Sequence, residues 1–407
     1  MHACILGSGI IGLATAYELH QRGCSVTVID ARPGPGEGAS AGNGAQLSYS
    51  YVQPLADPAI WKQLPKLFLE PDSPLKFRLQ ADPRQWRWGL EFLAACNAGR
   101  SHATTRALLE LAAHSRAGYD AMLAATGMSC DFAQPGKLVL YLSEAGVAGA
   151  RQQVALQAQM GGSPQSVLGR DETLAIEPAL TAYGPRIAGA VHTPSECVAD
   201  CHLVCTGLAA WLAERGVRFL YGTEVQGIVS AGGRARAVRT SAGEIEADQF
   251  VVSLGWQSPQ LLRPLGEHLP VYPLKGYSIT LDVAEAPDAA APRVSITDTS
   301  RKVVFARVGQ RLRVAGMVEL VGPDTRLDPT KIASLRNSTR AVFPSLQNTL
   351  TGDCAAWTGM RPATPTGLPI TRAAQGTGNL WINTGHGALG FTLAFGSAAQ
   401  LADAIVP

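Results

Sequence analysis

The start of the chain alternates between short apolar runs and one amphipathic segment. Residues 3–6 are apolar and match a short buried strand, whereas residues 13–22 place apolar side chains at helical spacing. Gly23 stands where it would end that helix, and residues 25–29 form a second apolar run that leads to Asp30. This order predicts a complete β-α-β unit with a glycine-rich turn between the first strand and the helix.

Farther along, short apolar segments again alternate with helical patterns. Between residues 272 and 319 the alternation of apolar and polar side chains instead has a period of two, which is typical of an antiparallel sheet. Asp200 is placed to cap the helix that follows it. The mixture predicts an α/β protein with an α+β second part. We expect strands at 138–142, 187–192, 218–221 and 249–254, a small meander between 223 and 247, and helices at 103–125, 151–160, 201–214, 331–340 and 392–405.

Composition narrows the class of protein without naming a function. The 407 residues suggest two or three domain-sized units, and 46% hydrophobic residues allow a large core. A formal net charge of +2 gives no reason to expect a nucleic-acid partner. Eight cysteines without a secretory signal favour free thiols in a reducing compartment. No run of eighteen strongly apolar residues predicts a membrane span, so we expect a cytoplasmic protein.

The turn after the first strand carries three glycines at the spacing of a dinucleotide-binding fingerprint. Gly7 permits the turn, Gly9 admits a pyrophosphate, and Gly12 lets the helix pack against the strand. Asp30 is placed to accept hydrogen bonds from ribose hydroxyls. The alternative is a glycine-rich turn that only packs. The residues predicted to bind the nucleotide here are Gly7, Ser8, Gly9, Ile10, Ile11, Gly12, Asp30, Ala31 and Arg32.

The stretch from residue 31 to residue 53 is loop-like and rich in small residues. Its glycines and amide side chains suit a loop that passes over a flavin or its phosphates. An ordinary surface loop explains the composition equally well. The residues assigned to the cofactor in this loop are Asn43, Gly44, Ala45 and Gln46.

Two C-terminal segments are candidates for the chemistry. Arg361, between Gly359 and Pro362, could hold a carboxylate with two hydrogen bonds. A short apolar strand at residues 380–384 leads into a glycine-spaced loop and a helix, where backbone N–H groups favour electron-rich ligands. A structural arginine is the alternative for Arg361. The loop contributes Gly385, His386, Gly387, Ala388, Leu389 and Gly390 to the predicted site.

Nothing in the sequence is an obvious binding site for a nicotinamide cofactor. Residues 249–254 form a buried strand that ends in a glycine turn at Gly255, where two-dinucleotide flavoenzymes close the nucleotide domain. A second glycine fingerprint does not follow. We therefore expect electrons to be exchanged with another partner.

Cys197, Cys201 and Cys205 are spaced four apart, with His192 and His202 nearby. A predicted cap at Asp200 leaves Cys197 before the helix, and no further close pair completes a zinc or iron–sulfur set. We therefore predict no metal.

Residues 58–95 mix aromatic and basic side chains, including three tryptophans at positions 61, 86 and 88. Such a mixture can lie on a membrane surface. A solvated helical face over a core edge is the alternative, and the composition favours it. Peripheral contact with the inner face of a membrane is thus a secondary expectation.

With these residues in view, the chain resembles the bacterial D-amino-acid dehydrogenases of the small-subunit type. This family belongs to the wider superfamily of D-amino-acid oxidase, glycine oxidase and sarcosine oxidase. The match runs nearly the whole length, and its later segments are more specific than the first. The residues that carry it are 5–12, 26–30, 271–278, 314–322, 357–362 and 383–387.

The resemblance implies a discontinuous, Rossmann-like FAD-binding domain and a substrate domain built on a mostly antiparallel sheet flanked by helices. It implies that Arg361 anchors the substrate carboxylate and that Tyr277 lies on the substrate side. His386 and its loop would lie near the flavin pyrimidine, Asn43–Gln46 near the flavin, and the backbone of Val225 near adenine. The implied boundaries are 1–55, 190–265 and 353–407 for the FAD domain, and 56–189 and 266–352 for the substrate domain.

The implied reaction is the oxidative deamination of a D-amino acid, with hydride transfer from Cα to flavin N5 and a quinone or other non-oxygen acceptor. Its products are a 2-oxo acid and ammonia. Relatives that attach FAD to a cysteine do so near this Trp357–Pro362 segment, but Cys354 is one position off, so we expect non-covalent FAD. The alternative is an oxidase or dehydrogenase of secondary amines or imino acids, such as glycine, sarcosine, D-proline or hydroxyproline, including as a subunit of a hetero-complex.

Overall fold

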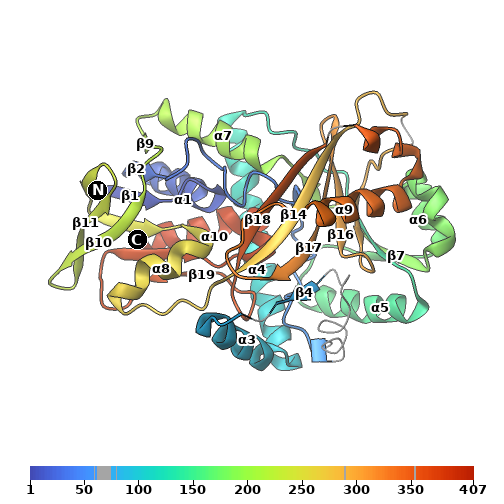
Figure 1. The fold of residues 1–407 in the computed structure, drawn as a ribbon, viewed down its shortest axis with the longest axis horizontal. Coiled ribbons are helices and arrows are strands. Elements are labelled where there is room, and N and C mark those ends of the chain that lie inside the picture. Colours follow the sequence, from blue (N-terminus) through green and yellow to red (C-terminus); the bar gives the residue numbers. More distant parts are fainter. Residues whose placement is uncertain (59, 62–74, 79, 288–289, 353) are drawn as a thin grey trace.

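Figure 1 shows an elongated molecule with a β-sheet and its packed helices towards each end. The glycine-rich N-terminus and the C-terminal helix lie at one end, and a larger sheet with α9, α5 and α6 forms the other. This computed structural model describes residues 1–58, 60–61, 75–78, 80–287, 290–352 and 354–407.

The predicted N-terminal β-α-β unit is present. Strand β1 (His2–Leu6) pairs in parallel with β2 (Ser25–Ile29), and helix α1 (Ile10–Gln21) connects them. The helix begins three residues earlier than its apolar periodicity indicated, because it starts directly from the glycine turn at Gly9. The tight turn therefore places the helix N-terminus at the carboxyl end of β1.

β1 lies inside a six-stranded sheet in the order β19-β20-β13-β1-β2-β9. All neighbours are parallel except the antiparallel pair at the β19 edge. The carboxyl ends of the parallel strands therefore share one edge, where doubly wound sheets bind ligands. The remaining strands are β9 (Arg218–Leu220), β13 (Gln249–Val252), β19 (Ile370–Ala373) and β20 (Leu380–Thr384).

Helices α1, α4 (Ala98–Thr126), α7 (Cys201–Ala213) and α10 (Gly390–Ile405) share one buried apolar cluster with β2. The carboxylate of Asp200 accepts the backbone N–H groups of His202 and Leu203, so the predicted cap of α7 is confirmed. A separate cluster joins residues of β1, β13 and β20 to the antiparallel meander. The meander strands are β10 (Val225–Ala231), β11 (Arg234–Thr240) and β12 (Gly243–Glu246).

Among the described residues, one segment, Gly387–Ile405, is long and apolar enough to cross a membrane by length and composition alone. Within the protein, however, 61% of its apolar window is buried. Helix α10 packs against α1 and α4, and core helices of soluble proteins have the same composition.

The larger sheet has nine strands, in the order β18-β14-β17-β16-β15-β5-β7-β6, with β4 beside β17. Its central strands from residue 272 to residue 320 are antiparallel neighbours, which confirms the predicted period-two segment. Its strands are β4 (Leu75–Phe77), β5 (Lys137–Tyr141), β6 (Ser166–Leu168), β7 (Gly189–Thr193), β14 (Tyr272–Asp282), β15 (Ser295–Asp298), β16 (Val303–Val308), β17 (Arg311–Leu320) and β18 (Ala355–Ala363).

Helix α9 (Pro329–Val342) contributes to the apolar cluster of this larger sheet. Helix α5 (Glu144–Gln159) starts seven residues before the predicted position, because Ser143 caps it by accepting the N–H of Gly146. Its first turns lack the apolar spacing that a sequence pattern can detect. The other elements are β3 (Gln46–Leu47), β8 (Cys197–Val198), α3 (Pro83–Ala95), α6 (Arg170–Ile176), α8 (Ser258–Leu262) and six short 3₁₀ helices at 178–186, 255–257, 263–265, 344–346, 349–351 and 387–389.

These sheets and helices confirm the predicted mixed α/β fold class.

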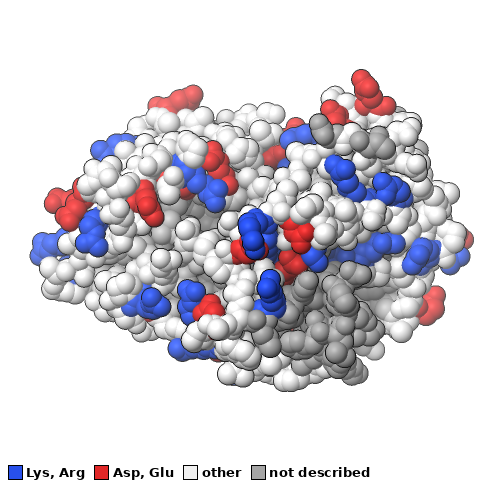
Figure 2. Space-filling model, in the orientation of Figure 1, with Lys and Arg blue, Asp and Glu red and all other residues white. Residues whose placement is uncertain are grey.

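In the region from 58 to 95, residues 59, 62–74 and 79 lie outside the described residues. Within α3, Trp88 and Phe92 are buried, whereas Trp86 is 51% and Leu90 69% exposed. Charges of both signs are interspersed on the face that Figure 2 shows.

Candidate active site

A cavity of about 1890 Å³ is lined by residues of both sheets. It collects almost every residue that the sequence singled out, from the glycine turn after β1 to the loop before α10. Of the predicted site residues, Ser8, Gly12 and Gly385 are the ones that do not line it. The C-terminal edge of the small sheet and the inner face of the large one therefore share a single candidate site.

The three fingerprint glycines have separate structural roles. Gly7 has a φ of +107°, and a Cβ there would lie 2.6 Å from the carbonyl oxygen of Ser253. A Cβ on Gly12 would lie 1.9 Å from the oxygen of Gly7, so the helix could not pack as closely. Gly9 faces the cavity, and the nearest atom to its ideal Cβ is Ser40 Oγ at 3.6 Å. The cradle at Gly9 is therefore open to a ligand.

Asp30 ends β2 beside this turn and lines the cavity. Its Oδ2 accepts the N–H and the hydroxyl of Ser8, both at 2.7 Å, and its Oδ1 accepts the N–H of Arg32 at 2.9 Å. Two carboxylate oxygens offer about four acceptor positions, so capacity remains for a ribose hydroxyl. Ser8 therefore orients the carboxylate from behind the cavity wall.

The loop at residues 42–46 is held in place from several sides. Asn43 Oδ1 accepts the N–H of Ala45, which has a φ of +57°, and the carbonyl of Asn43 accepts from Arg313 Nη1 at 2.9 Å. Ser278 donates its hydroxyl to the carbonyl of Gly42 at 2.7 Å. These contacts fix a loop whose composition alone left its role open.

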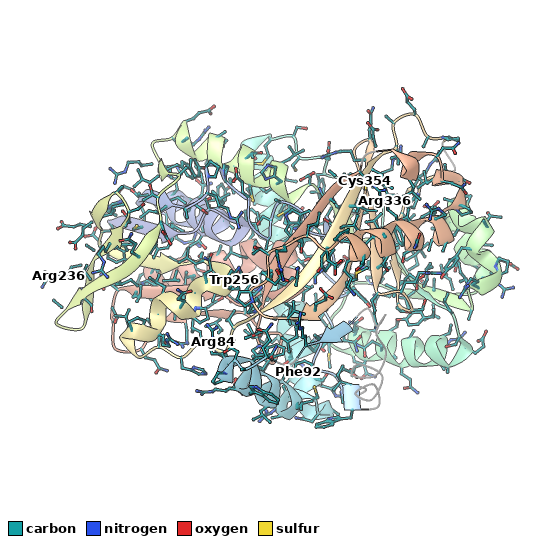
Figure 3. All side chains as sticks on the ribbon, viewed as in Figure 1. Arg84, Phe92, Arg236, Trp256, Arg336 and Cys354 are labelled. Carbon is teal, nitrogen blue, oxygen red and sulfur yellow. The ribbon has the colours of Figure 1, made fainter. Side chains whose placement is uncertain are left out.

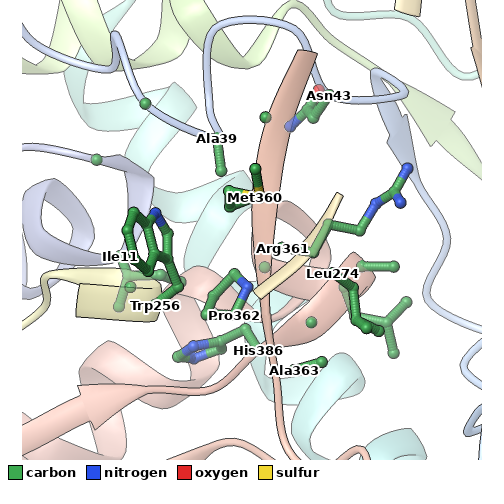
Figure 4. A pocket seen from close by; sticks show the side chains of 18 of the residues that line it. Ile11, Ala39, Asn43, Trp256, Leu274, Met360, Arg361, Pro362, Ala363 and His386 are labelled. Carbon is green, nitrogen blue, oxygen red and sulfur yellow. The ribbon is translucent and has the colours of Figure 1, made fainter. Parts of the chain in front are cut away.

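Arg361 projects from β18 across β14. A Cβ on Gly276 would lie 2.4 Å from the guanidinium, so the guanidinium fits here only because residue 276 has no side chain. Arg361 Nη1 donates to the carbonyl oxygen of Met317 at 2.9 Å. Burial lowers the pKa of Arg361 to about 10, which leaves it charged at neutral pH. In Figure 4, the Arg361 side chain points away from Trp256, Pro362 and His386.

The carbonyl that receives Arg361 comes from an irregularity in β17. The register with β14 shifts between Lys275 and Tyr277, so that β17 carries an extra residue. Met317 sits in this bulge with a φ of +64°, an uncommon conformation for a residue other than glycine. The bulge changes the direction of the backbone at Met317, a residue that lines the cavity, so that its carbonyl oxygen faces Arg361.

Tyr277 lines the cavity from β14, but its hydroxyl is already engaged. It donates to Glu319 Oε2 at 2.7 Å, and Lys331 Nζ lies 3.3 Å from the other carboxylate oxygen. Burial, together with the Glu319 carboxylate, raises the pKa of Tyr277 well above its usual value. The side chain therefore remains a neutral phenol.

His386 is 2% exposed and lies in the loop between β20 and α10. Its Nε2 is 2.8 Å from Ser397 Oγ, and its backbone bridges to Ala363 in β18. Burial lowers the pKa of His386 to about 3, so the ring is neutral. This geometry favours a role for the loop backbone over acid–base chemistry by the ring.

Cys354 lies outside the cavity wall formed by the described residues. Arg336 donates to its Sγ from Nε and Nη2 at 3.2 and 3.0 Å. Figure 3 shows this pair far from Trp256, which lines the cavity. All eight cysteines are free thiols. No group of three or more metal-ligating side chains is found among the described residues.

The sequence did not identify several cavity residues. The position of Met317 on the cavity wall depends on a shift in strand register, which no local sequence pattern reveals. Trp256 follows the glycine turn at Gly255 but belongs to no recognisable motif. The indole of Trp357 lies where a Cβ on Gly42 or Gly359 would be, at 2.3 and 2.1 Å, which explains both glycines. Lys137 is the first residue of β5, and apart from its apolar neighbours nothing in the sequence indicates that it lies in the cavity wall.

The sequence matches the FAD dependent oxidoreductase family (DAO) over residues 2–404. The chain therefore belongs to this family and is an FAD-dependent oxidoreductase. The open cradle at Gly9, beside Asp30 and the N-terminus of α1, fits the pyrophosphate and ribose of FAD.

Among its relatives, the chain is 49% identical to D-amino acid dehydrogenase 2 of Ralstonia nicotianae, over 100% of this chain and 96% of that protein. It is 46% identical to D-amino acid dehydrogenase 2 of Pseudomonas aeruginosa, over 99% and 94%. Its fold is similar to that of glycine oxidase from Geobacillus kaustophilus (TM-score 0.78, 21% identity, 99% and 94% covered) and of L-proline dehydrogenase from P. horikoshii (0.76, 18%, 100% and 93%).

Proposed function

We propose that this enzyme oxidises D-amino acids to imino acids, which water hydrolyses to 2-oxo acids and ammonia. The observation that carries the proposal is Arg361, a guanidinium deep in the cavity, seated over Gly276 and held by Met317. Such a group pairs with a carboxylate by two parallel hydrogen bonds. The names of the relatives at 46–49% identity support a D-amino acid as the acid.

FAD, when bound, supplies the two-electron acceptor for the oxidation. The residues that would hold it are Gly7 and Gly9 at the pyrophosphate, Asp30 at the ribose, Val225 at adenine, and the loops at 42–46 and 385–390 at the ring. The position of Cys354, paired with Arg336 away from the cavity-lining residues, supports non-covalent attachment.

The chain contributes orientation of the substrate to the reaction. Arg361 fixes the substrate at its carboxylate, so that the rest of the molecule is positioned along the wall formed by Tyr277 and Met317. The neutral states of His386 and Tyr277 mean that neither serves as a charged acid or base at neutral pH. The substrate reacts with its amine in the neutral form, because the nitrogen lone pair must be free to form the C=N bond of the imino acid.

We also propose that residues 1–55, 190–265 and 353–407 form the FAD-binding part, and 56–189 and 266–352 the substrate part. Every strand of the six-stranded sheet comes from the first set, which supports this division. Strands β7 and β18 pair within the larger sheet, so the chain crosses between the parts at these strands.

The proposed electron acceptor is a quinone or another non-oxygen acceptor. No second glycine fingerprint follows the strand that ends at Gly255, which supports this choice, and the glycine spacing of residues 385–390 belongs to the loop that lines the same cavity. We further propose a cytoplasmic protein that contacts the inner face of the membrane peripherally. Exposed Trp86 and Leu90 on α3 support that contact, while Arg84 and Arg87 of the same helix pair with Asp82 and Glu91.

The test is anaerobic reduction of the purified flavoprotein. D-Alanine, D-methionine or D-norleucine should bleach the flavin absorbance, and their L-enantiomers should not. Added quinone should restore the colour faster than air does. If only glycine, sarcosine or L-proline bleaches the protein, the D-amino-acid assignment is wrong and the secondary-amine alternative replaces it.

A further inference from the structure

The cavity wall next to Arg361 is apolar where β14 forms it. Leu274 of β14 is the register partner of Arg361 in β18, so the two side chains stand on one face of the sheet with Cβ atoms roughly 5 Å apart. The guanidinium lies over Gly276, two residues along β14, and therefore on that same face. Adjacent strands lie about 4.8 Å apart, a separation that the side chain of leucine or phenylalanine spans. A substrate held at Arg361 can thus place its side chain against Leu274.

The apolar surface extends from Leu274 to both neighbouring parts of the wall. Ala363 stands two residues after Arg361 on β18, shares its face and lines the cavity. Val318 also lines the cavity and directly follows Met317, whose carbonyl oxygen accepts from Arg361. Leu274, Ala363 and Val318 pack in one apolar cluster. They therefore form a continuous apolar surface beside the guanidinium.

Two aromatic side chains of α3 belong to the same surface. Trp88 and Phe92 are each 3% exposed, line the cavity, and stack with ring centroids 5.2 Å apart and an interplanar angle of 8°. The indole Nε1 of Trp88 donates to the carbonyl oxygen of Ala363 at 2.9 Å. This bond fixes the pair against β18 and uses the single polar atom of the indole. What the pair offers a ligand is therefore apolar.

We infer that this apolar surface is the pocket for the substrate side chain and selects D-amino acids with bulky apolar side chains. The inference rests on the proposed function, because it assumes an amino acid held by its carboxylate at Arg361. An apolar side chain gains free energy when it leaves water for this pocket, whereas a polar side chain of the same shape loses hydrogen bonds that the pocket does not replace. The pocket consists of Leu274, Val318, Ala363, Trp88 and Phe92.

The competing explanation places the substrate side chain against a polar part of the cavity wall that precedes α3. Gln53 and Asp57 line the cavity there, and Gln53 Nε2 donates to Asp57 Oδ2 at 3.4 Å. In that case substrates with an amide or ammonium group would be preferred, and Leu274 would serve only to pack β14 against α3. The two explanations predict opposite preferences between substrates of equal size.

The experiment compares D-leucine with D-asparagine, because their side chains have the same branching and the same number of heavy atoms but differ in polarity. We expect kcat/KM of the wild-type enzyme to favour D-leucine by roughly 30-fold or more. Leu274→Ala removes apolar surface that the D-leucine side chain contacts, so it should lower this ratio by roughly fivefold.

Leu320→Ala is the matched control. Leu320 is buried in the same apolar cluster, but it is not among the residues that line the cavity. The substitution removes the same atoms from the cluster and should leave the D-leucine to D-asparagine ratio unchanged. Flavin content and the unfolding temperature report whether each variant folds.

Three results would overturn the inference. Equal use of the two substrates by the wild-type enzyme, or a preference for D-asparagine, does so even if Leu274→Ala does not fold. An unchanged ratio in folded Leu274→Ala assigns Leu274 to packing alone, and an equal fall of the ratio in Leu320→Ala assigns the effect to a general loosening of the cluster. Failure of every D-amino acid to bleach the flavin would instead overturn the proposed function.

Discussion

At the scale of single residues, Arg361 shows how the fold prepares a charge for a ligand. The guanidinium lies over Gly276 and uses one N–H on the carbonyl of Met317. Burial lowers its pKa to about 10, so the surroundings destabilise the charged form. A bound carboxylate would offset that cost, which is why an acid is the expected ligand.

We expect Arg361→Lys to lower kcat/KM for D-alanine about 100-fold, because lysine keeps the charge but loses the planar two-point contact. Flavin content should stay unchanged. Steady-state kinetics and the flavin-to-protein absorbance ratio provide the measurements. Arg236→Lys, at an exposed position on β11 far from the cavity residue Trp256 in Figure 3, is the matched control.

Two other outcomes would change the assignment. Wild-type turnover in Arg361→Lys would remove Arg361 from substrate binding. Loss of flavin and a lower unfolding temperature together with the loss of activity would make it a structural arginine.

At the scale of elements, the turn between β1 and α1 separates a packing glycine from a ligand-facing one. Gly12 has no room for a Cβ because the oxygen of Gly7 occupies that place. Gly9 has an ordinary extended backbone, with φ −70° and ψ 174°, and space at its Cβ. The same motif thus contains one position required by the fold and one required by the ligand.

Gly9→Ala should therefore fold normally but bind FAD at least about tenfold more weakly, because the methyl group enters the pyrophosphate cradle. Gly12→Ala should yield little folded protein, since the helix must move away from the strand. Thermal unfolding without added flavin, followed by flavin titration, distinguishes the two effects. Full FAD affinity in Gly9→Ala would contradict the placement of the pyrophosphate.

Element boundaries followed the sequence closely where apolar periodicity was present or the cap was recognised, whereas α4, capped by Asn97, began five residues before its predicted start. The β-α-β unit, the Asp200 cap and the antiparallel run all formed where expected. Helix α5 began earlier than predicted, because its start depends on the Ser143 cap and not on an apolar stripe. The sequence could not predict the bulge at Met317 for a different reason, because strand register is defined only once two strands are paired.

At the scale of the whole molecule, two exposed apolar side chains of α3 lie near the cavity. Trp86 and Leu90 are exposed on α3, while Trp88 and Phe92 of the same helix are buried and line the cavity. One helix therefore connects the interior site to the surface. This arrangement motivates a test of the proposed membrane contact.

We expect the wild-type protein to co-sediment with vesicles that contain anionic lipid and to be released by high salt. The double variant Trp86→Ser, Leu90→Ser should stay in the supernatant. Phe132→Ser, which alters an exposed aromatic residue outside the 58–95 region, is the control. Equal sedimentation of both variants would refute the proposed contact.

The sequence by itself determined the dinucleotide fingerprint, the order of helices and strands, and the arginine as a candidate ligand for an acid. These features are local: a glycine's backbone freedom, a cap or a periodic stripe acts within a few residues. Only the tertiary structure brought β18, β14 and β17 together, so that Arg361 lies over Gly276 and meets Met317. It also placed Lys137 on the wall of the same cavity. Such neighbours are set by strand pairing between distant segments, and pairing buries surface that no single segment can bury alone.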